Sequence, residues 1–478
     1  MASTTDANLE KYFKYIDDNT TFLIDQLRDV VAIPSVSCDA KYRSEVIRMG
    51  EWIKTRLEGL GARVQMVHPG PQELQGQTVQ LPPVVLGEYG TDPAKKTITI
   101  YGHYDVQPAL KSDGWDTDPF TLVETEDGRL VGRGSTDDKG PVLGWILCLE
   151  AHQKLGIDIP VNLKFCFEGM EESGSIGLDA IIRDQADKWF KGTDYTCICD
   201  NYWLGTTKPC LTYGLRGNNY FFVEVSGPAA DLHSGVFGGT VQEPLVALTR
   251  LMSTLVDIDG KILIPGIYDQ VAETTQEENK TYEGLSFKNT DLIEDLKADC
   301  VIHDSDAETL KSRWRFPSLS LHGIEGAFYE AGSKTVIPAK VTGKFSIRTV
   351  PYMEIDTVNE LTTKHLNAEF AKLNSKCTLK VSADKAGRWW YSSPNHPNFV
   401  AGARAIKRVF KTEPELTREG GSIPITLTFE EALKANVLLL PMGSANDGAH
   451  STNEKVNKYN YIEGIKLFGA YWAEIANL

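Results

Sequence analysis

Apolar residues between Leu9 and Leu60 recur at helical spacing, which predicts that the chain opens with helices. The sequence IPSVS at residues 33–37 interrupts this pattern and separates two predicted helices. The next apolar run, TITIYGHYDVQP at residues 97–108, is rich in threonine and isoleucine and predicts a strand. His103 and Asp105 lie at the end of this strand.

Strand and helix patterns then alternate. Residues 141–154 predict a helix, whereas residues 161–167 and 195–199 predict strands that run into acidic segments. Such alternation indicates an α/β domain with a mixed, largely parallel sheet flanked by helices. In sheets of this kind, functional groups gather at the carboxyl ends of the strands.

The pattern changes between residues 214 and 385, where strand-like and helical runs predict an inserted α+β domain. The strand-and-helix alternation returns after it. We therefore expect a discontinuous first domain, residues 1–213 and 386–478, interrupted by a second domain at 214–385. The length of 478 residues supports this division, because single hydrophobic cores stop growing near roughly 250–300 residues.

The formal net charge of -16 disfavours nucleic acid and anionic membrane surfaces as partners. Eight scattered cysteines form no spacing typical of a disulfide framework or a structural zinc site, and we expect mostly buried thiols. The N-terminus lacks the apolar core of a secretory signal, and no apolar run approaches the roughly 20 residues of a membrane-spanning helix. A cytoplasmic location is therefore expected.

His103 and Asp105 stand two residues apart in an extended segment, so both side chains leave the backbone on the same side. A carboxylate can accept the second ring proton of a metal-bound imidazole. A capped or buried histidine is the alternative. Asp137 and Asp138 follow in GRGSTDDKGP, where an aspartate can bridge two cations or merely cap the helix predicted near Pro141.

Glu171 and Glu172 follow an apolar strand directly, and adjacent carboxylates repel each other unless a cation lies beside them. One can bind a metal while the other acts as a general base; two solvated loop glutamates are the alternative. Asp200 and His450 also follow apolar strands. An acid or histidine at several strand ends of one sheet is the arrangement that a metal cluster needs.

Seven segments together resemble those of carnosinase-type dipeptidases within the aminoacylase and carboxypeptidase-like metallopeptidase group. They are YGHYDVQP, GRGSTDDKGP, CFEGMEESGS, DNYWLG, DLHSG, REGGSIPITLTF and DGAHSTNEK. The resemblance extends over nearly the whole chain and includes both the cytosolic non-specific and the Cys-Gly dipeptidases of this family. It implies a di-metal peptidase domain with an inserted dimerisation or lid domain.

The resemblance implies two divalent metal ions per subunit. One ion would be bound by His103 and Asp200, and the other by Glu172 and His450, with Asp137 bridging both. Glu171 would be the catalytic base, and Asp105 the carboxylate partner of His103. Asp138 receives no ligand role. The chain departs from the family pattern at Asn446, where relatives often carry an acid, but Asn446 lies outside the ligand set.

The inserted domain contributes further residues by the same resemblance. His233 in DLHSG would reach the active site of the neighbouring subunit in a homodimer and stabilise the oxyanion. Thr335, Arg348 and Ser422 would bind substrate, together with the metal ligands Asp200 and His450. An arginine suits a terminal carboxylate because its fork binds both oxygens. A buried ion pair for Arg348 and a helix cap for Ser422 are the alternatives.

The implied activity is hydrolysis of dipeptides, such as Cys-Gly or carnosine-like substrates, by a water activated between two metals and deprotonated by Glu171. The ligand set suits both Zn²⁺ and Mn²⁺, and the sequence does not decide between them. An amino-acid deacylase is the nearest rival and differs in needing an apolar acyl pocket in place of an ammonium site. A catalytically silent scaffold is the rival from another class, although all matched ligand positions are intact.

Overall fold

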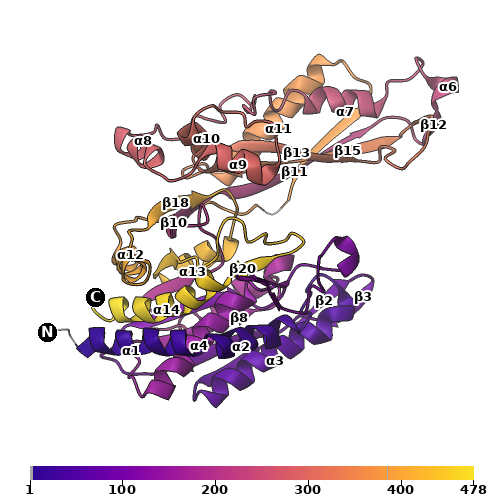
Figure 1. Cartoon of the computed structure of the whole chain (residues 1–478). Helices are drawn as coiled ribbons and strands as arrows, with labels where there is room; N and C mark the ends of the chain where they lie inside the picture. Colours follow the sequence, from indigo (N-terminus) through magenta and orange to yellow (C-terminus); the bar gives the residue numbers. More distant parts are fainter. Residues whose placement is uncertain (1–3, 385) are drawn as a thin grey trace. The chain divides into compact units, whose positions relative to one another are not determined.

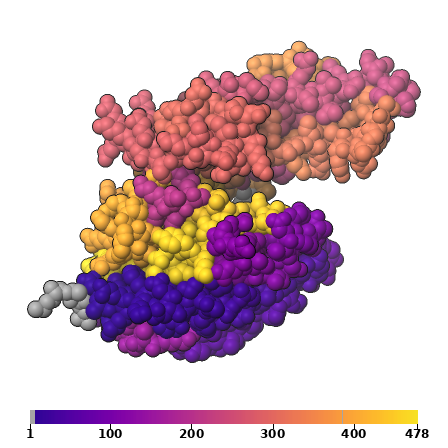
Figure 2. All heavy atoms as spheres, viewed as in Figure 1, coloured from indigo at the N-terminus to yellow at the C-terminus, as the bar shows by residue number. Residues whose placement is uncertain are grey.

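The computed structural model describes residues 4–384 and 386–478, which form two compact units. Unit 1 comprises Met1–Tyr213, Ser392–Thr417 and Ile425–Leu478, and unit 2 comprises Gly214–Tyr391 and Arg418–Pro424. In Figures 1 and 2, unit 1 combines both ends of the colour scale, whereas unit 2 has the colours of the middle of the chain. The roles of the two units as catalytic and dimerisation domains stay predictions.

Unit 1 contains most of the helices and strands at both ends of the chain (Figure 1). In chain order they are α1 (Thr4–Asp18), α2 (Thr20–Val31), α3 (Arg43–Gly59), β1 (Arg63–Val67), β2 (Pro71–Leu74), β3 (Gln77–Gln80), β4 (Val84–Tyr89), β5 (Thr97–His103), β6 (Val123–Glu124), β7 (Arg129–Val131), α4 (Lys139–Leu155), β8 (Asn162–Glu168), α5 (Leu178–Gln185), β9 (Tyr195–Ile198), β10 (Cys210–Leu215), α12 (Pro397–Phe410), β18 (Glu415–Glu419), α13 (Pro424–Leu433), β19 (Asn436–Leu439), β20 (Lys455–Asn457) and α14 (Lys458–Ile475). β10, β18 and α13 each extend one or two residues beyond the bounds of unit 1. Short 3-10 turns cover Ala40–Tyr42, Lys111–Asp113 and Glu171–Ser173.

The large sheet has the strand order β1-β4-β8-β5-β9-β19-β10-β17, with β18 also paired to β10; β17 (Trp390–Tyr391) pairs with Gly214 and Leu215 at the end of β10. Its centre is parallel, because β8, β5, β9 and β19 run in the same direction. β4 and β10, which flank this centre, are antiparallel to it, and β1 is in turn antiparallel to β4. β8 is buried along its whole length, as expected for a central strand covered on both faces.

Helices α4 and α14 approach each other closely in the core of unit 1. The ring of Trp145 stacks on that of Phe468, with centroids 3.6 Å apart and an interplanar angle of 9°. Gly144 permits this approach, because a Cβ atom there would lie 2.9 Å from Cε2 of Phe468. The packing anchors α4, whose first turn follows the candidate ligand Asp137.

Unit 2 is an α+β fold around a four-stranded antiparallel sheet of order β13-β15-β11-β16. Its elements are β11 (Gly217–Ser226), β12 (Leu232–His233), α6 (Ser234–Phe237), α7 (Pro244–Met252), α8 (Gln276–Glu283), α9 (Asn289–Leu296), α10 (Asp306–Trp314), β13 (Ser318–Glu325), β14 (Val336–Ile337), β15 (Lys340–Thr349), α11 (Ile355–Lys372), β16 (Thr378–Ala383) and β17 (Trp390–Tyr391). Alternate residues of β11 are buried, among them Phe221 and Val223. They pack with Leu248 of α7 and Leu366 of α11 in one apolar core.

The predicted α/β fold with a mixed sheet and a parallel centre is confirmed. The predicted break at residues 33–37 is confirmed, because it separates α2 from α3, whereas a further break at Asn19, between α1 and α2, is not predicted. The side-chain amide of Asn19 donates a hydrogen bond to the carbonyl of Tyr15, in the last turn of α1, at 2.8 Å. The periodicity continues across this junction, so the apolar pattern alone does not reveal it.

Candidate metal centre

Four parallel strands bring the predicted site residues of unit 1 to one edge of its sheet. His103 is the last residue of β5, and Glu171 and Glu172 follow β8. Asp200 follows β9, and the segment containing His450 follows β19. Because the carboxyl ends of parallel strands share an edge, residues far apart in the sequence become neighbours.

Two groups of side chains could each hold a metal ion, and both include Asp137. In the first group, Nε2 of His103 lies 3.0 Å from Oδ1 of Asp137 and 3.6 Å from Oδ1 of Asp200. In the second, Nε2 of His450 lies 3.1 Å from Oδ2 of Asp137 and 2.9 Å from Oε2 of Glu172. The two carboxylate oxygens of Asp137 therefore face different groups, as a bridging ligand requires.

The charges at this edge fit divalent cations. Burial raises the pKa of Asp200 to about 6 and raises the pKa of Glu171 well above its usual value. Burial also acts on Asp137, but hydrogen bonds from His103 and His450 hold its pKa below the usual range. Buried acids whose charged forms are destabilised in this way need a positive charge nearby, and divalent ions would supply it.

Both imidazoles are strongly basic in the metal-free protein. Burial lowers the pKa of His103, but hydrogen bonds to Asp105, Asp137 and Asp200 outweigh it and raise the pKa well above 6.5. Hydrogen bonds to Asp137 and Glu172 raise the pKa of the more exposed His450. The carboxylates proposed to bind the cations therefore also favour the protonated form of both imidazoles.

Asp105 connects the ends of β5 and β8. Its two carboxylate oxygens accept hydrogen bonds from the backbone N–H groups of Glu171 and Glu172, each at 3.1 Å. Its Oδ1 also lies 3.4 Å from Nδ1 of His103, on the side of the ring opposite Asp137. The backbone carbonyl of Asp105 lies closer to the same nitrogen, at 3.1 Å. Asp105 thus orients the imidazole through both groups, and its carboxylate holds the segment with the adjacent glutamates.

The alternative of Asp137 as a helix cap finds no support in the geometry. Helix α4 begins at Lys139, its N-cap is Asp138, and no side-chain hydrogen bond caps it. Asp138 instead accepts the backbone N–H of His103 through Oδ2 at 3.1 Å. Its peptide bond to Asp137 is cis.

Glu454 is a buried residue whose role the sequence analysis did not identify. Its Oε1 accepts the backbone N–H groups of Gly134, Thr136 and Asp137 at 3.0–3.1 Å. Its Oε2 forms an ion pair of 2.7 Å with Arg133, which is 3% exposed. The carboxylate therefore holds the loop that carries Asp137. It lies in the segment DGAHSTNEK, but no feature of that segment distinguishes it from a surface glutamate.

Replacing Glu454 by alanine should lower the free energy of unfolding by about 3–5 kcal/mol, because the guanidinium of Arg133 would stay buried without its partner. Urea denaturation of the metal-free protein measures this change. Glu126→Ala is the control, since Glu126 is exposed, and should change stability by less than about 0.5 kcal/mol. Equal stability of the two variants would contradict the role of Glu454.

Two of the predicted substrate-binding residues of unit 2, Arg348 and Ser422, contact each other, and the other two, His233 and Thr335, lie on or next to neighbouring strands. Nη1 of Arg348 donates to Oγ of Ser422 at 3.0 Å, and Ser422 Oγ donates to the carbonyl of Arg216 at 2.5 Å. Among the described residues, Arg348 has no ion pair, and Ser422 makes no side-chain cap to a helix. His233 of β12 and Thr335, next to β14, are both exposed, and the N–H of Ser234 donates to the carbonyl of Thr335 at 3.2 Å.

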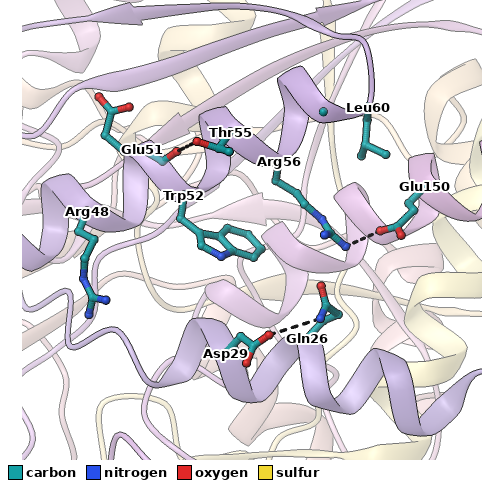
Figure 3. Close-up of a pocket in the computed structure, with 10 residues that line it drawn as sticks. Gln26, Asp29, Arg48, Glu51, Trp52, Thr55, Arg56, Leu60 and Glu150 are labelled. Carbon is teal, nitrogen blue, oxygen red and sulfur yellow. Dashed lines mark hydrogen bonds and ion pairs between the residues drawn. The ribbon is translucent and has the colours of Figure 1, made fainter.

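Unit 1 also has a surface hollow of about 780 Å³ formed by α2, α3 and α4 (Figure 3). Trp52 points from α3 toward α2, and Arg56 pairs with Glu150 of α4 at 2.5 Å. None of the described residues that line the hollow is a predicted site residue. It is therefore separate from the candidate metal centre.

The cysteines and the apolar helices bear on two further expectations from the sequence. All eight cysteines are free, six of them buried, among them Cys197 and Cys199 at the end of β9. Within residues 4–384 and 386–478, no helix combines the length and apolarity needed to cross a membrane.

Comparisons with known proteins agree with this arrangement. A profile of peptidase family M20/M25/M40 matches residues 99–474. The Cys-Gly metallodipeptidase dug1 of Schizosaccharomyces pombe is 54% identical over 98% of this chain and 99% of its own length. The human Beta-Ala-His dipeptidase is 47% identical over 99% of this chain and 94% of its own. The solved structure of the di-peptidase Dug1p from Saccharomyces cerevisiae has a TM-score of 0.89, with 48% identity over 98% of this chain and 99% of that one.

The chain belongs to peptidase family M20/M25/M40. The expected relationship to carnosinase-type metallopeptidases is thereby confirmed, and with it the prediction of an enzyme of the hydrolase class. Two groups of metal-ligating side chains agree with the expectation of a di-metal centre. The role of each individual residue remains a prediction.

Proposed function

We propose that this chain is a metal-dependent dipeptidase that hydrolyses the peptide bond of short substrates such as Cys-Gly or carnosine-like dipeptides. The observation that carries the proposal is Asp137, whose two oxygens face two separate histidine–carboxylate groups. The names of the similar proteins, Cys-Gly metallodipeptidase and Beta-Ala-His dipeptidase, support dipeptides as the substrate class.

The residues proposed to hold two divalent ions are His103, Asp200, Glu172 and His450, with Asp137 shared between them. Such ions would supply Lewis-acid activation of a water and of the scissile carbonyl. Mn²⁺ and Zn²⁺ are both compatible with one imidazole per site and carboxylates otherwise. Free thiols throughout the chain suit a reducing compartment, so a cytoplasmic location is part of the proposal.

Glu171 is proposed as the general base. Burial raises its pKa, which brings the carboxylate closer to the basicity that proton transfer near neutral pH requires. Asp105 positions it by accepting the backbone N–H of Glu171 at 3.1 Å. Glu171 would take a proton from the attacking water and return it to the leaving amine, whereas Glu172 faces His450.

The proposed substrate-binding residues are the metal ligands Asp200 and His450 of unit 1 and four residues of unit 2. Arg348, oriented by Ser422, would bind the carboxylate terminus of the dipeptide with charge-assisted hydrogen bonds. His233 is proposed to act in the active site of a second copy of the chain, where it would donate a hydrogen bond to the developing oxyanion. Thr335 is proposed to contact the substrate near His233. This arrangement requires a homodimer.

Mixing two inactive variants tests the exchange of His233 between subunits. Neither His233→Ala nor Glu171→Gln should be active alone, but a mixed dimer contains one site with both residues intact. Random exchange of subunits should restore about a quarter of the wild-type activity. No recovery, although native mass spectrometry detects mixed dimers, would contradict the role of His233 in the partner's site.

Metal binding is expected to release protons, because ions bind neutral imidazole whereas His103 and His450 have raised pKa values in the metal-free protein. Affinity should therefore increase with pH, by about tenfold per unit for each proton released. Calorimetric titration with Zn²⁺ at pH 7, in two buffers of different ionisation enthalpy, counts these protons. Heats that do not depend on the buffer would contradict the expectation.

The decisive experiment compares hydrolysis of Cys-Gly with that of N-acetyl-Cys-Gly by metal-stripped protein, before and after addition of Mn²⁺ or Zn²⁺. Activity on the free dipeptide alone, and only with metal, is expected. Activity chiefly on the acetylated compound would make the protein a deacylase, since such an enzyme replaces the ammonium site by an acyl pocket. Inactivity on both compounds would favour a silent scaffold.

A further inference from the structure

Unit 2 contains a hollow of about 850 Å³ that the proposed catalytic function does not use. We name it the α9–α10 pocket, because residues of α9, α10 and the start of β13 line it together with the loop 259–261 (the helices and β13 are labelled in Figure 1). Small-molecule sites in proteins usually have volumes of about 300–1,000 Å³. The pocket is therefore large enough for a compact organic ligand.

Most of the pocket wall is apolar. Six of its residues are Tyr268, Leu292, Leu296, Ile302, Phe316 and Leu319. Leu296 is 62% exposed and Ile302 is 65% exposed. Exposed aliphatic side chains that line a concave surface gain free energy when an apolar group covers them. The wall thus favours a ligand with an aliphatic or aromatic body.

The charged groups of the pocket are mostly cationic. Arg216, Arg313 and Lys261 line it, and Asp259 is the acid among its lining residues. Within the described part of the chain, none of these three cations forms a salt bridge. Their accumulation is notable in a chain with a net charge of -16, and it favours an anionic ligand.

Arg216 is the most buried of these cations. Burial, followed by the nearby charge of Arg348, lowers the pKa of Arg216 to about 10; Glu419 partly opposes this, and Arg313 adds a smaller effect in the lowering direction. Like charges gathered in this way repel each other. A ligand with one negative charge would reduce the repulsion.

Arg216 also connects the pocket with the proposed carboxylate-binding residue Arg348. Its guanidinium donates to Oγ of Ser318 at 2.9 Å and to the carbonyl of Gly420 at 3.1 Å. Its own carbonyl accepts Ser422 Oγ, and Ser422 Oγ accepts Nη1 of Arg348. Ser318 is in addition the cross-strand partner of Arg348 in the β13–β15 register.

We propose that the α9–α10 pocket binds a small organic acid with an apolar body, and that its occupancy weakens binding of the dipeptide carboxylate at Arg348. The first part stands on the shape and charge of the pocket alone. The second part rests on the proposed function.

Two effects of the bound acid should both weaken binding of the dipeptide carboxylate at Arg348. An anion paired with Arg216 draws its guanidinium away from the Gly420 carbonyl and loosens the segment that carries Ser422, the partner of Arg348. The anion also reduces the positive potential at Arg348, which attracts the substrate carboxylate. We expect KM for the dipeptide to rise about fivefold at saturating acid, a typical coupling between two sites, with little change in kcat.

Binding is tested by calorimetry on the full-length, metal-loaded protein with 4-phenylbutyrate and its neutral analogue 4-phenylbutanamide. The acid should bind at least about tenfold more tightly than the amide, since hydrogen bonds to a charged group are stronger than those to a neutral one. Ile302→Asn and Arg313→Gln should each weaken binding of the acid. Ile258→Asn is the matched control, because Ile258 is 96% exposed and does not line the pocket.

The possible results test binding at the α9–α10 pocket separately from its coupling to Arg348. Equal binding of acid and amide, no binding of either, or unchanged binding of the acid to Ile302→Asn would overturn the site, whether or not the protein is a peptidase. If the acid binds at the pocket, KM for Cys-Gly should rise in the wild type and in Ile258→Asn but not in Ile302→Asn. Binding that leaves KM of an active enzyme unchanged would overturn the coupling to Arg348.

Discussion

Replacing Glu171 by glutamine is expected to lower kcat for Cys-Gly by about 10²- to 10⁴-fold, the usual contribution of a general base. Glutamine keeps the size of the side chain but cannot accept a proton. Because Glu171 belongs to neither candidate ligand group, the variant should retain its metal content. Steady-state kinetics and elemental analysis of the same preparation measure both quantities.

The control for this variant is Glu126→Gln, which removes an exposed carboxylate of the same unit and should leave kcat unchanged. A second measurement is the pH profile. Burial raises the pKa of Glu171, so in the wild type kcat/KM should fall as protonation removes the base at low pH. With metal kept saturating at every pH, the residual activity of Glu171→Gln should lack this acidic limb. A near-normal rate in the variant would refute the assignment of the base.

The strand ends of unit 1 could be predicted from the sequence because each combines a local apolar run with an abrupt change to charged residues. His103, Glu172 and Asp200 each follow such a run within a few residues. Parallel pairing of β5, β8 and β9 then places these ends on one edge. The resemblance to a known family added what periodicity does not contain, namely which residues share a metal.

Residues that act through long-range contacts could not be predicted in this way. Glu454 lies more than 300 positions after the N–H groups of Gly134 and Asp137 that it accepts, and its neighbours in sequence are ordinary polar residues. Asp105 could be predicted as a partner of His103, but its bonds to the backbone of Glu171 and Glu172 depend on how the loop after β8 turns. Such contacts are properties of the folded chain.

The hydrogen bond between Arg348 and Ser422 is a further contact that the sequence does not predict. The residue types alone also allow a buried ion pair for the arginine and a helix cap for the serine, because these are common roles of arginine and serine in proteins. The structure instead joins the two side chains to each other and to the carbonyl of Arg216. Three separate segments meet there, so no single stretch of sequence contains the arrangement.

Asp137→Asn is expected to have the second large effect, because Asp137 is the residue that both candidate ligand groups share. An amide cannot offer a charged oxygen to each of two ions, and its NH₂ group would face one of the imidazoles. Substitutions of groups that only orient a metal ligand already weaken metal binding by about 10- to 100-fold. We therefore expect the loss of the shared ligand to remove both ions during dialysis and to abolish measurable hydrolysis.

Single-group variants provide the comparison that makes this test specific. Asp200→Asn affects only the group around His103, and Glu172→Gln affects only the group around His450. Each should keep about one ion per chain, since the other group still contains its histidine and Asp137. Elemental analysis after dialysis therefore distinguishes a shared ligand from three equivalent ones. If Asp137→Asn retains as much metal as the single-group variants, Asp137 does not bridge the two ions, and the di-metal interpretation of this edge of the sheet is wrong.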